Sequence, residues 1–597
     1  ESPGAHDRFP AWSPDGEKIA WFSDANGEYQ LMITDQKGAE APEVISFDDP
    51  SFYYGPYWSP DSKKLAFYDK HLNLYFLNLE DKDPVKIDQD PYANPRPKFN
   101  PDWSPDSKWI TYTRRLNNKL NAVFVYNVQT GEKRQITDGM SETTYPTFGA
   151  EGKHLFFAAS TDYGLNASWL DMTNYPHRVT SSLYAVVLEK GKESPFAPES
   201  DEEETTDKND TANNQKEEEE VSVQIDFQDI DQRIVSIPVP PRTYSGLEGA
   251  TKGKLFYRES VPDKPGYVLH AFDMEKQKDE VYLEGIQDYQ VSADGEKMIY
   301  ATLGNGYHIA ETKAKPEPGS GKLDLSELKI YVKPEKEWKQ LFEEVWRIER
   351  DFFYVENMHG ANWKAVKEKY QKFLPHVGHR EDLTYLISEM MGDMVVGHNY
   401  VGGGDLPETE SVPTGLLGAD FTIENNHYRF EKIYSGLNWN PSFNAPLTKP
   451  GVDVNEGDYL LAVDGKIVDS EQNIYSYFQN TVDKQVQLKV NSRPSLEGAR
   501  EVTVIPVNSE RNLRNMHWVE QNRQKVNEMT NGRVAYVYMP NTGGGGYTFF
   551  NRYYFSQLDK EAVIIDERFN GGGSAADYVI NLLDREIMNY WKHRDGK

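Results

Sequence analysis

The chain has 597 residues, of which 38% are hydrophobic and 13% aromatic, with a mean hydropathy of −0.73. At roughly 150 residues per domain this length predicts about four domains, and no apolar run approaches the ~20 residues that a membrane-spanning helix needs. The net charge of −30 argues against nucleic acid or an anionic membrane as the main partner, and the absence of cysteine excludes disulfides, cysteine nucleophiles and thiolate metal sites.

The first half of the chain repeats a Trp-Ser-Pro-Asp segment, which begins at Trp12, Trp58 and Trp103. These copies lie 46 and 45 residues apart, and a degenerate copy begins at Phe148, another 45 residues on. Each copy leads into a short run rich in β-branched and aromatic residues, and Pro-Asp followed by Gly or Ser favours a tight turn. The pattern predicts strand, turn and strand in each repeat.

Weaker copies around Gly253 and Gly295 bring the total to six recognisable repeats in about 310 residues. A four-stranded unit of ~40–50 residues is the period of a β-propeller blade. We therefore predict an all-β propeller over residues 1–315, with a seventh blade left open. The repeats resemble the TolB-like propellers, and we expect their tryptophans to pack between blades and not to bind a ligand.

Residues 199–220 concentrate the charge, with eleven acidic side chains against two lysines. Almost nothing in this segment is apolar, so it cannot bury enough surface to offset the entropy of ordering it. We predict a disordered, solvated loop over about 196–222. An electrostatic gate or a cation-binding tail is the alternative.

Residues 316–333 are predicted to form a linker, because the stretch around their start is rich in proline, glycine and charge. Apolar residues between positions 338 and 352 then recur at helical spacing and predict an amphipathic helix. This helix opens a predicted helical subdomain over residues 334–408. His359 follows in a turn before Gly360, where an imidazole can face a cleft, although a lone histidine is more often structural.

The segment from Phe352 through Met358-His359-Gly360 to Trp363 resembles the tricorn protease family. The resemblance implies that His359 is the general base of a serine peptidase. A second segment, Gly392 to Gly403, resembles the Gly-His-x-Tyr turn of the same subdomain. It makes His398 a second candidate near the site, with a structural turn histidine as the alternative.

Residues 409–508 are predicted to form a PDZ domain, since the string ending in Asp464-Gly465 resembles the PDZ hairpin and favours a two-residue turn. PDZ domains bind an extended peptide as an added strand. The candidate substrate-binding residues are those of the glycine-rich loop whose backbone N–H groups can hold a carboxylate: Gly415, Leu416, Leu417 and Gly418. The alternative is a PDZ domain that serves only as a spacer.

Residues 509–597 alternate strand and helix, with glycine runs after strands predicted at 533–540 and 562–568 and a helix predicted at 574–587. A strand, a glycine turn and a helix N-terminus form an anion pocket. A nucleotide site is disfavoured because neither G-x-G-x-x-G nor G-x-x-x-x-G-K-[ST] is present. The region is predicted to be an α/β peptidase core.

The string from Asp566 to Gly573 resembles the Asp-x-Arg-x-Asn-x-Gly-Gly signature that tricorn shares with the C-terminal processing peptidases. The resemblance implies that the Gly543 turn lies beside the active site and supplies an oxyanion N–H. It also makes four loop residues substrate-binding candidates, namely Asn570, Gly571, Gly572 and Gly573.

We expect the nucleophilic serine, and the residue that orients His359, beyond residue 597, where the family has them. Ser574 directly follows the glycines and is a weak alternative. No Gly-x-Ser-x-Gly elbow is present, which disfavours the prolyl oligopeptidase type. Both ends of the sequence look cut.

The resemblance thus implies a multidomain serine endopeptidase or oligopeptidase that degrades oligopeptides or unfolded proteins through an acyl-enzyme, without a metal or other cofactor. The propeller and the PDZ domain would guide the substrate. A homo-oligomer, with a hexamer as its specific form, is expected in the cytoplasm, and a periplasmic or secreted form is the alternative. The functional alternative is a noncatalytic propeller–PDZ scaffold that binds peptides.

Overall fold

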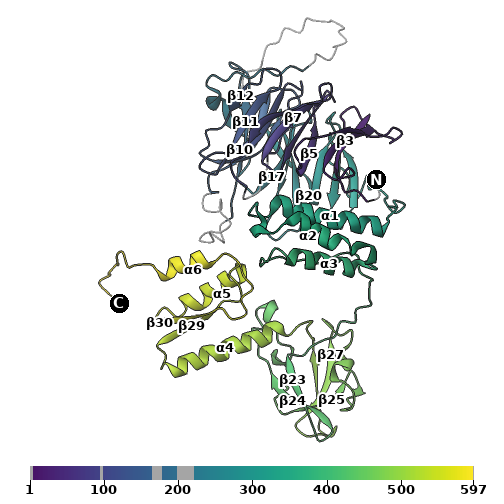
Figure 1. The fold of residues 1–597 in the computed structure, drawn as a ribbon. Helices are drawn as coiled ribbons and strands as arrows, with labels where there is room; N and C mark the ends of the chain where they lie inside the picture. Colours follow the sequence, from purple (N-terminus) through teal and green to yellow (C-terminus); the bar gives the residue numbers. More distant parts are fainter. Residues whose placement is uncertain (1–3, 94–98, 164–177, 198–220, 305, 596–597) are drawn as a thin grey trace. The chain divides into compact units, whose positions relative to one another are not determined.

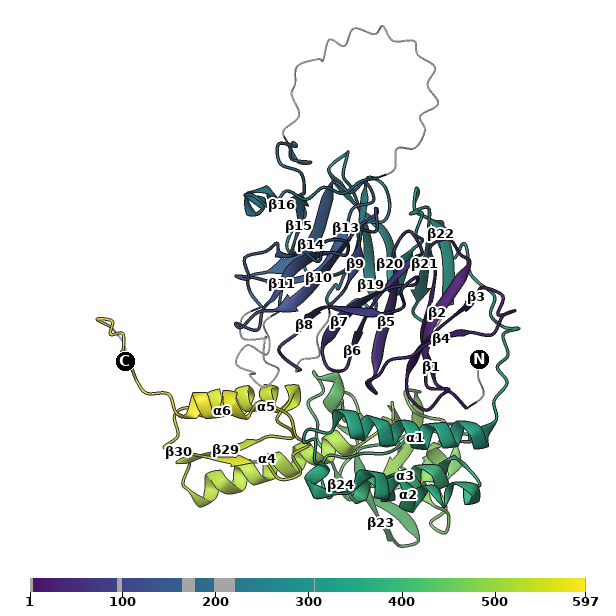
Figure 2. The same ribbon diagram turned by 45° about the horizontal axis from the view of Figure 1, so that its top comes forward.

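The computed structural model describes residues 4–93, 99–163, 178–197, 221–304 and 306–595. The chain divides into two compact units, the first formed by residues 1–168 and 176–405 and the second by residues 169–175 and 406–597. Figure 1 shows the strands and helices of both units, and Figure 2 shows them from a second direction. Residues 198–220 of the predicted acidic loop lie outside the described residues.

The first unit contains five antiparallel β-sheets among the residues described. Four of them have four strands each, in chain order. These strands are β1 (Asp7–Trp12), β2 (Lys18–Ser23), β3 (Gln30–Asp35), β4 (Glu43–Ile45), β5 (Tyr53–Trp58), β6 (Lys64–Asp69), β7 (Asn73–Asn78), β8 (Pro84–Gln89), β9 (Asp102–Trp103), β10 (Trp109–Arg115), β11 (Asn121–Asn127), β12 (Lys133–Gln135), β13 (Glu142–Phe148), β14 (His154–Ser160), β15 (Ser182–Val187) and β16 (Ile234–Ser236). Each sheet corresponds to one sequence repeat, so the predicted propeller is confirmed.

The fifth sheet has six strands and contains the two weaker repeats. Its strands are β17 (Tyr244–Glu248), β18 (Lys254–Glu259), β19 (Tyr267–Asp273), β20 (Lys278–Val291), β21 (Lys297–Thr302) and β22 (Gly306–Glu311). The first half of β20 pairs with β19 and its second half with β21, so one long strand serves both repeats. Lys322 forms a further bridge to His308, which places the start of the predicted linker along β22.

The repeated segment forms the turn between the first two strands of a sheet. Ser13 Oγ donates to Asp15 Oδ1 at 2.5 Å, and Ser59 and Ser104 make the same bond to the aspartate two residues on. A side chain that caps its own turn in this way fixes the hairpin locally. This is why the repeat was recognisable from the sequence.

The repeat tryptophans join neighbouring sheets. The indole N–H of Trp58 donates to Ala11 O at 3.0 Å, and that of Trp103 donates to Tyr57 O at 3.1 Å. Packing between sheets is thus confirmed for these two residues. The prediction is wrong for Trp12, whose side chain is 57% exposed.

Three helices follow the propeller in the first unit: α1 (Pro334–Phe352), α2 (Trp363–Gln371) and α3 (Arg380–Gly392). Proline near the start of α1 suits the first turn of a helix, where the missing N–H has no helical partner. The three helices share an apolar cluster that includes Phe342, Trp363 and Leu383. Within α1 the residues of this cluster recur at helical spacing, as the sequence predicts.

Helix α1 contacts the first sheet of the propeller through buried charged groups. Tyr29 Oη donates to Glu344 Oε1 at 2.6 Å, and the Arg347 guanidinium pairs with both Asp24 and Glu344. Arg350 adds a bidentate pair with Glu28. The helical subdomain is thereby fixed to the propeller within the first unit.

The second unit begins with a six-stranded sheet in the order β23-β24-β25-β27-β28, with β26 paired to β25. Its strands are β23 (Ala419–Glu424), β24 (His427–Ile433), β25 (Tyr459–Val463), β26 (Lys466–Ile467), β27 (Val486–Asn491) and β28 (Arg500–Val504). Asp464 has a φ of 47°, as the predicted two-residue turn requires. Apolar side chains such as Phe430, Leu460 and Leu488 fill its core.

The rest of the second unit is an α/β layer, formed by α4 (Arg511–Met529), β29 (Val534–Tyr538), α5 (Gly544–Phe555), β30 (Ala562–Asp566) and α6 (Ala576–Leu583). Strands β29 and β30 are parallel, as expected for a strand-helix-strand unit. Figure 1 shows α4 running from the six-stranded sheet along these strands. Helix α6 is shorter than the predicted helix at 574–587.

No helix in the described part of the chain is both long and apolar enough to cross a membrane.

Candidate active site

His359 lies in a tight turn between α1 and α2. The turn residues Met358, His359 and Gly360 all have positive φ, at 51°, 54° and 87°. Left-handed backbone at a residue other than glycine costs on the order of 1–3 kcal/mol and persists only when its surroundings enforce it. Met358 supplies that enforcement, since it is only 5% exposed in the helical core, while His359 is exposed to solvent.

Aromatic side chains hold the His359 ring. The hydroxyl of Tyr354 forms a 2.5 Å hydrogen bond with His359 Nε2, and the ring of Phe353 meets the imidazole edge-on at 5.1 Å. Below the turn, the indole N–H groups of Trp346 and Trp363 donate to each other's backbone carbonyl. The predicted base thus lies on a short loop whose two ends are held together by hydrogen bonds.

His398 lies in a bend after α3, with a φ of 60°. Its ring stacks on Tyr400 at 6.5 Å, and both side chains are exposed. Among the described residues, its ring contact is to Tyr400 and not to the His359 loop. The role of His398 therefore stays a prediction.

Two glycine loops meet at the carboxyl ends of β29 and β30. Thr542 N–H donates to Gly572 O at 2.9 Å, and Ala575 N–H donates to Thr542 O at 2.5 Å. A Cβ atom on Gly573 would lie 2.2 Å from the carbonyl carbon of Thr542, so only glycine fits there. The structure thus brings the Gly543 turn and the loop of Asn570 to Gly573 together.

Gly543 is the residue that precedes α5, and its N–H donates to Asn541 Oδ1 at 3.0 Å. Gly546 N–H donates to the same oxygen at 2.8 Å. The amides of Gly544 and Gly545 belong to the first helical turn, where N–H groups have no partner within the helix. These N–H groups form the positive end of the α5 helix dipole, which faces the junction of the two glycine loops.

Asn541 is not among the site residues predicted from the sequence, although the sequence carries a signal for it. Asparagine commonly bonds to the backbone two residues on and so opens a turn, and here it stands directly before the run of glycines. In this structure the N–H of Gly543, the predicted oxyanion donor, already donates a hydrogen bond to the Asn541 side chain.

Asp566 and Arg568 of the signature form an ion pair at 2.5 Å, and Tyr536 Oη donates to Asp566 at 2.7 Å. The hydrogen bonds from Arg568 lower the pKa of Asp566 to about 2. Burial and the hydrogen bond to this carboxylate raise the pKa of Tyr536 to about 12. The guanidinium also lies 4.8 Å over the ring of Trp518, which holds it in place.

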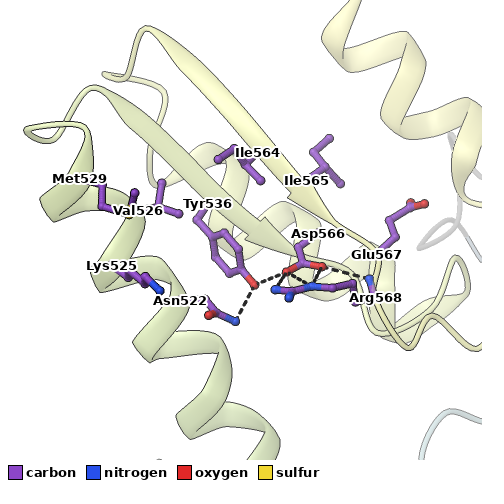
Figure 3. A pocket seen from close by; sticks show the side chains of 10 residues that line it. All are labelled: Asn522, Lys525, Val526, Met529, Tyr536, Ile564, Ile565, Asp566, Glu567 and Arg568. Atoms are coloured by element: carbon purple, nitrogen blue, oxygen red, sulfur yellow. Dashed lines mark hydrogen bonds and ion pairs between the residues drawn. The ribbon is translucent and has the colours of Figure 1, made fainter.

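An open hollow of about 660 Å³ lies beside this pair (Figure 3). Figure 3 shows Asn522, Tyr536, Asp566 and Arg568 joined by hydrogen bonds on one side of it. The lining residues are Asn522, Lys525, Val526, Met529, Tyr536, Ile564, Ile565, Asp566, Glu567 and Arg568. The sequence did not predict Asn522 or Tyr536, because neither belongs to the recognised signature.

The predicted carboxylate-binding loop precedes β23. Gly415 N–H donates to Phe478 O, and Leu416 exchanges backbone bonds with Val507. Leu417 is buried in the core of the six-stranded sheet. Gly418 N–H donates to the side chain of Glu510 at 2.7 Å, so this amide already holds a carboxylate.

The predicted site residues fall into two sets. His359 and His398 belong to the first unit, whereas the loop at 415–418, Gly543 and the loop at 570–573 belong to the second.

Three family models match the chain. Residues 1–313 match the tricorn protease second beta propeller domain, residues 334–392 the tricorn protease C1 domain, and residues 415–509 the tricorn protease PDZ domain.

Curated proteins give the same picture. A putative tricorn-like protease C-terminal subunit of Sulfurisphaera tokodaii is 31% identical over 510 residues, which cover 82% of this chain and 56% of that protein. A tricorn protease homolog of Saccharolobus solfataricus is 30% identical over 490 residues, which cover 78% of this chain and 43% of the relative. The chain spans about half the length of the curated relatives it matches.

Among solved structures, the crystal structure of the tricorn protease superimposes with a TM-score of 0.84 at 20% identity, covering 99% of this chain and 57% of that one. This likeness shows a shared fold. Since the matched propeller model alone spans more than half of the sequence, the chain belongs to the tricorn protease family.

Proposed function

We propose that the chain forms part of a serine-type peptidase that hydrolyses oligopeptides or unfolded polypeptides, with His359 as the general base. The observation that carries the proposal is the exposed imidazole of His359 on a strained turn, anchored by the buried Met358. Strained backbone of this kind clusters at active sites. The relatives named as proteases in the comparisons support the reaction class.

In the proposed mechanism His359 takes the proton from a serine hydroxyl, whose oxygen attacks the peptide carbonyl. We expect this serine beyond residue 597. Backbone N–H groups at the start of α5 stabilise the oxyanion, since the amides of Gly544 and Gly545 are aimed along the helix axis. Water then hydrolyses the acyl-enzyme.

The junction of the two glycine loops suits an extended substrate. Backbone bonds between Thr542 and Gly572 hold the loops in one conformation, so their remaining N–H groups are preorganised. The loop from Asn570 to Gly573 is proposed to line the substrate path, and the propeller and PDZ domain to guide peptides toward it.

The proposal also includes the oligomeric state of the protein and its cellular compartment. We expect a homo-oligomer, with a hexamer as the specific expectation, in the cytoplasm, and a periplasmic or secreted form as the alternative. Sedimentation velocity of the natural full-length protein measures the first, and fractionation of its source cells the second.

The test of the peptidase compares the natural full-length protein with His359→Ala and His359→Gln variants on a set of fluorogenic peptides. Removing the general base should lower kcat by about 10³-fold or more in both variants. Circular dichroism and thermal unfolding check that the exposed side chain can be replaced without loss of the fold. Turnover at the wild-type rate in either variant contradicts the assignment of His359.

A further inference from the structure

Two backbone amides at the start of β23 converge on a carboxylate of the same chain. Gly418 N–H donates to Glu510 Oε1 at 2.7 Å, and Ala419 N–H lies 3.4 Å from the same oxygen. The left-handed φ of Gly418, at 75°, turns these neighbouring amides toward a common point. Leu513 packs under the loop, 3.2 Å from where a Cβ on Gly418 would lie, so the loop rests directly on α4.

The second oxygen of Glu510 is held by Arg514, one turn further along α4. The guanidinium donates to Glu510 Oε2 from Nε at 2.9 Å and from Nη2 at 2.6 Å. Its Nη1 donates to Asp420 Oδ1 at 2.7 Å, and Tyr434 Oη donates to the other oxygen of Asp420 at 2.8 Å. The Glu510 side chain is 7% exposed, and both of its oxygens are bonded.

This anion site lies at one end of an edge strand. In the sheet order β23 comes first and pairs with β24 alone. An edge strand that begins with free amides is the arrangement by which a PDZ domain takes up an added peptide strand and captures its terminal carboxylate. In this chain the amides of Gly418 and Ala419 at the start of the edge strand hold the Glu510 carboxylate.

We propose that Glu510 is a built-in ligand that closes the PDZ domain to peptide C-termini. The same bond fastens the six-stranded sheet to α4, which continues along β29 of the α/β layer. A peptide that ends in a carboxylate has to displace an intramolecular group present at an effective concentration of about millimolar or more. The proposal narrows the substrate-guiding role proposed above, because the PDZ domain would then guide peptides without binding their C-terminal carboxylate, and it rests on that role for its biological meaning.

The first test measures peptide binding. The probe is a fluorescein-labelled peptide mixture with its last four residues randomised, prepared with either a free or an amidated C-terminus. Wild-type protein should bind both forms equally within about twofold, whereas Glu510→Ala should prefer the free carboxylate by about tenfold or more. A tenfold preference in the wild type, or no preference in a folded Glu510→Ala variant, overturns the proposal.

Two further variants sharpen this comparison. Glu510→Gln keeps an oxygen that can accept from Gly418 N–H but loses the charge that pairs with Arg514, so its preference should lie between those of wild type and alanine. Glu520→Gln changes a glutamate on the same helix that pairs with Arg523, and it should behave as wild type. If Glu520→Gln also came to prefer the peptide with a free C-terminus, the preference would arise from a change in α4 and not from the loss of Glu510 from the anion site.

The second test uses acetate as a substitute for the missing side chain. In Glu510→Ala, acetate should raise the thermal unfolding midpoint more than chloride at the same ionic strength, because it can bind the Gly418 amide and Arg514. The wild-type protein should respond to both salts alike. Equal responses in the variant mean that these groups form no anion site. Neither test depends on peptide hydrolysis, so failure here is distinguishable from failure of the peptidase proposal.

Discussion

Trp346 and Trp363 each donate the indole N–H to the backbone carbonyl of the other, and both hydrogen bonds measure 2.9 Å. The two residues stand on α1 and at the start of α2, so the pair closes the loop that presents His359. Trp363 is 6% exposed, and its ring packs in the same cluster as Met358. The position of the proposed base is thus set by paired polar groups in an apolar core.

Replacing Trp363 with phenylalanine keeps an aromatic ring but removes the N–H that donates to the Trp346 carbonyl. This carbonyl lies inside α1 and keeps its helical hydrogen bond, so the helical subdomain should lose about the 0.5–1.5 kcal/mol that one hydrogen bond contributes. The loop should loosen as well, which lowers kcat of the full-length protein more than KM. Trp338→Phe, on the same helix at the edge of the cluster, is the control. Equal kcat values in the two variants would show that the pair does not position His359.

The sequence predicted features that are local and missed those that join distant residues. The Ser13–Asp15 bond lies within one turn, so the turn was recognisable from its residues. By contrast Tyr29 and Glu344, which share a buried hydrogen bond, are 315 residues apart and carry no common pattern. The occupied loop at Gly418 was missed for the same reason. Its partner Glu510 is 92 residues away.

In the proposed mechanism the Tyr354 hydroxyl competes with the serine hydroxyl for His359 Nε2. Its Oη lies 2.5 Å from His359 Nε2, and each ring nitrogen makes one hydrogen bond in the ring plane. Tyr354→Phe should therefore leave kcat/KM within about threefold of wild type or raise it. Tyr385→Phe, at another exposed tyrosine of the helical subdomain, is the control. A hundredfold fall in Tyr354→Phe would instead make the hydroxyl part of the mechanism.

The contact of α1 with the propeller should depend on acid pH. Burial by itself raises the pKa of Glu344, but hydrogen bonds from His6, Tyr29 and Arg347 outweigh it and lower the pKa from 4.5 to about 2. Because the pKa is lower in the folded state, the stabilisation is complete above about pH 4.5 and is lost as the pH falls toward 2. A shift of this size corresponds to about 3 kcal/mol.

Glu344→Gln should lower the thermal unfolding midpoint of the first unit near neutral pH. Between pH 4.5 and 2, the midpoint of this variant should fall less with decreasing pH than that of the wild type. Differential scanning calorimetry over this range measures both effects. The control is Glu337→Gln, which changes an exposed glutamate in the first turn of the same helix. If Glu344→Gln and wild type lose stability in parallel over this range, the carboxylate does not hold α1 on the propeller.

The junction of the two glycine loops should be sensitive to a single methyl group at Gly573. With φ at 137°, a Cβ there would lie 2.2 to 2.4 Å from three backbone atoms of Thr542 and Gly543, none of which can move away as a side chain would. Gly573→Ala should therefore separate the loops and lower peptide hydrolysis by about a hundredfold or more, because preorganised N–H groups are lost.

Gly572→Ala is the matched control for this variant. Gly572 also has a positive φ, at 84°, but a Cβ on it would meet no atom within 4 Å. Its substitution thus imposes backbone strain of about 1 kcal/mol without a collision. Hydrolysis should fall less in Gly572→Ala than in Gly573→Ala by at least about tenfold, as measured with the same fluorogenic peptides. Equal losses would mean that backbone strain, and not the contact between the loops, sets the activity.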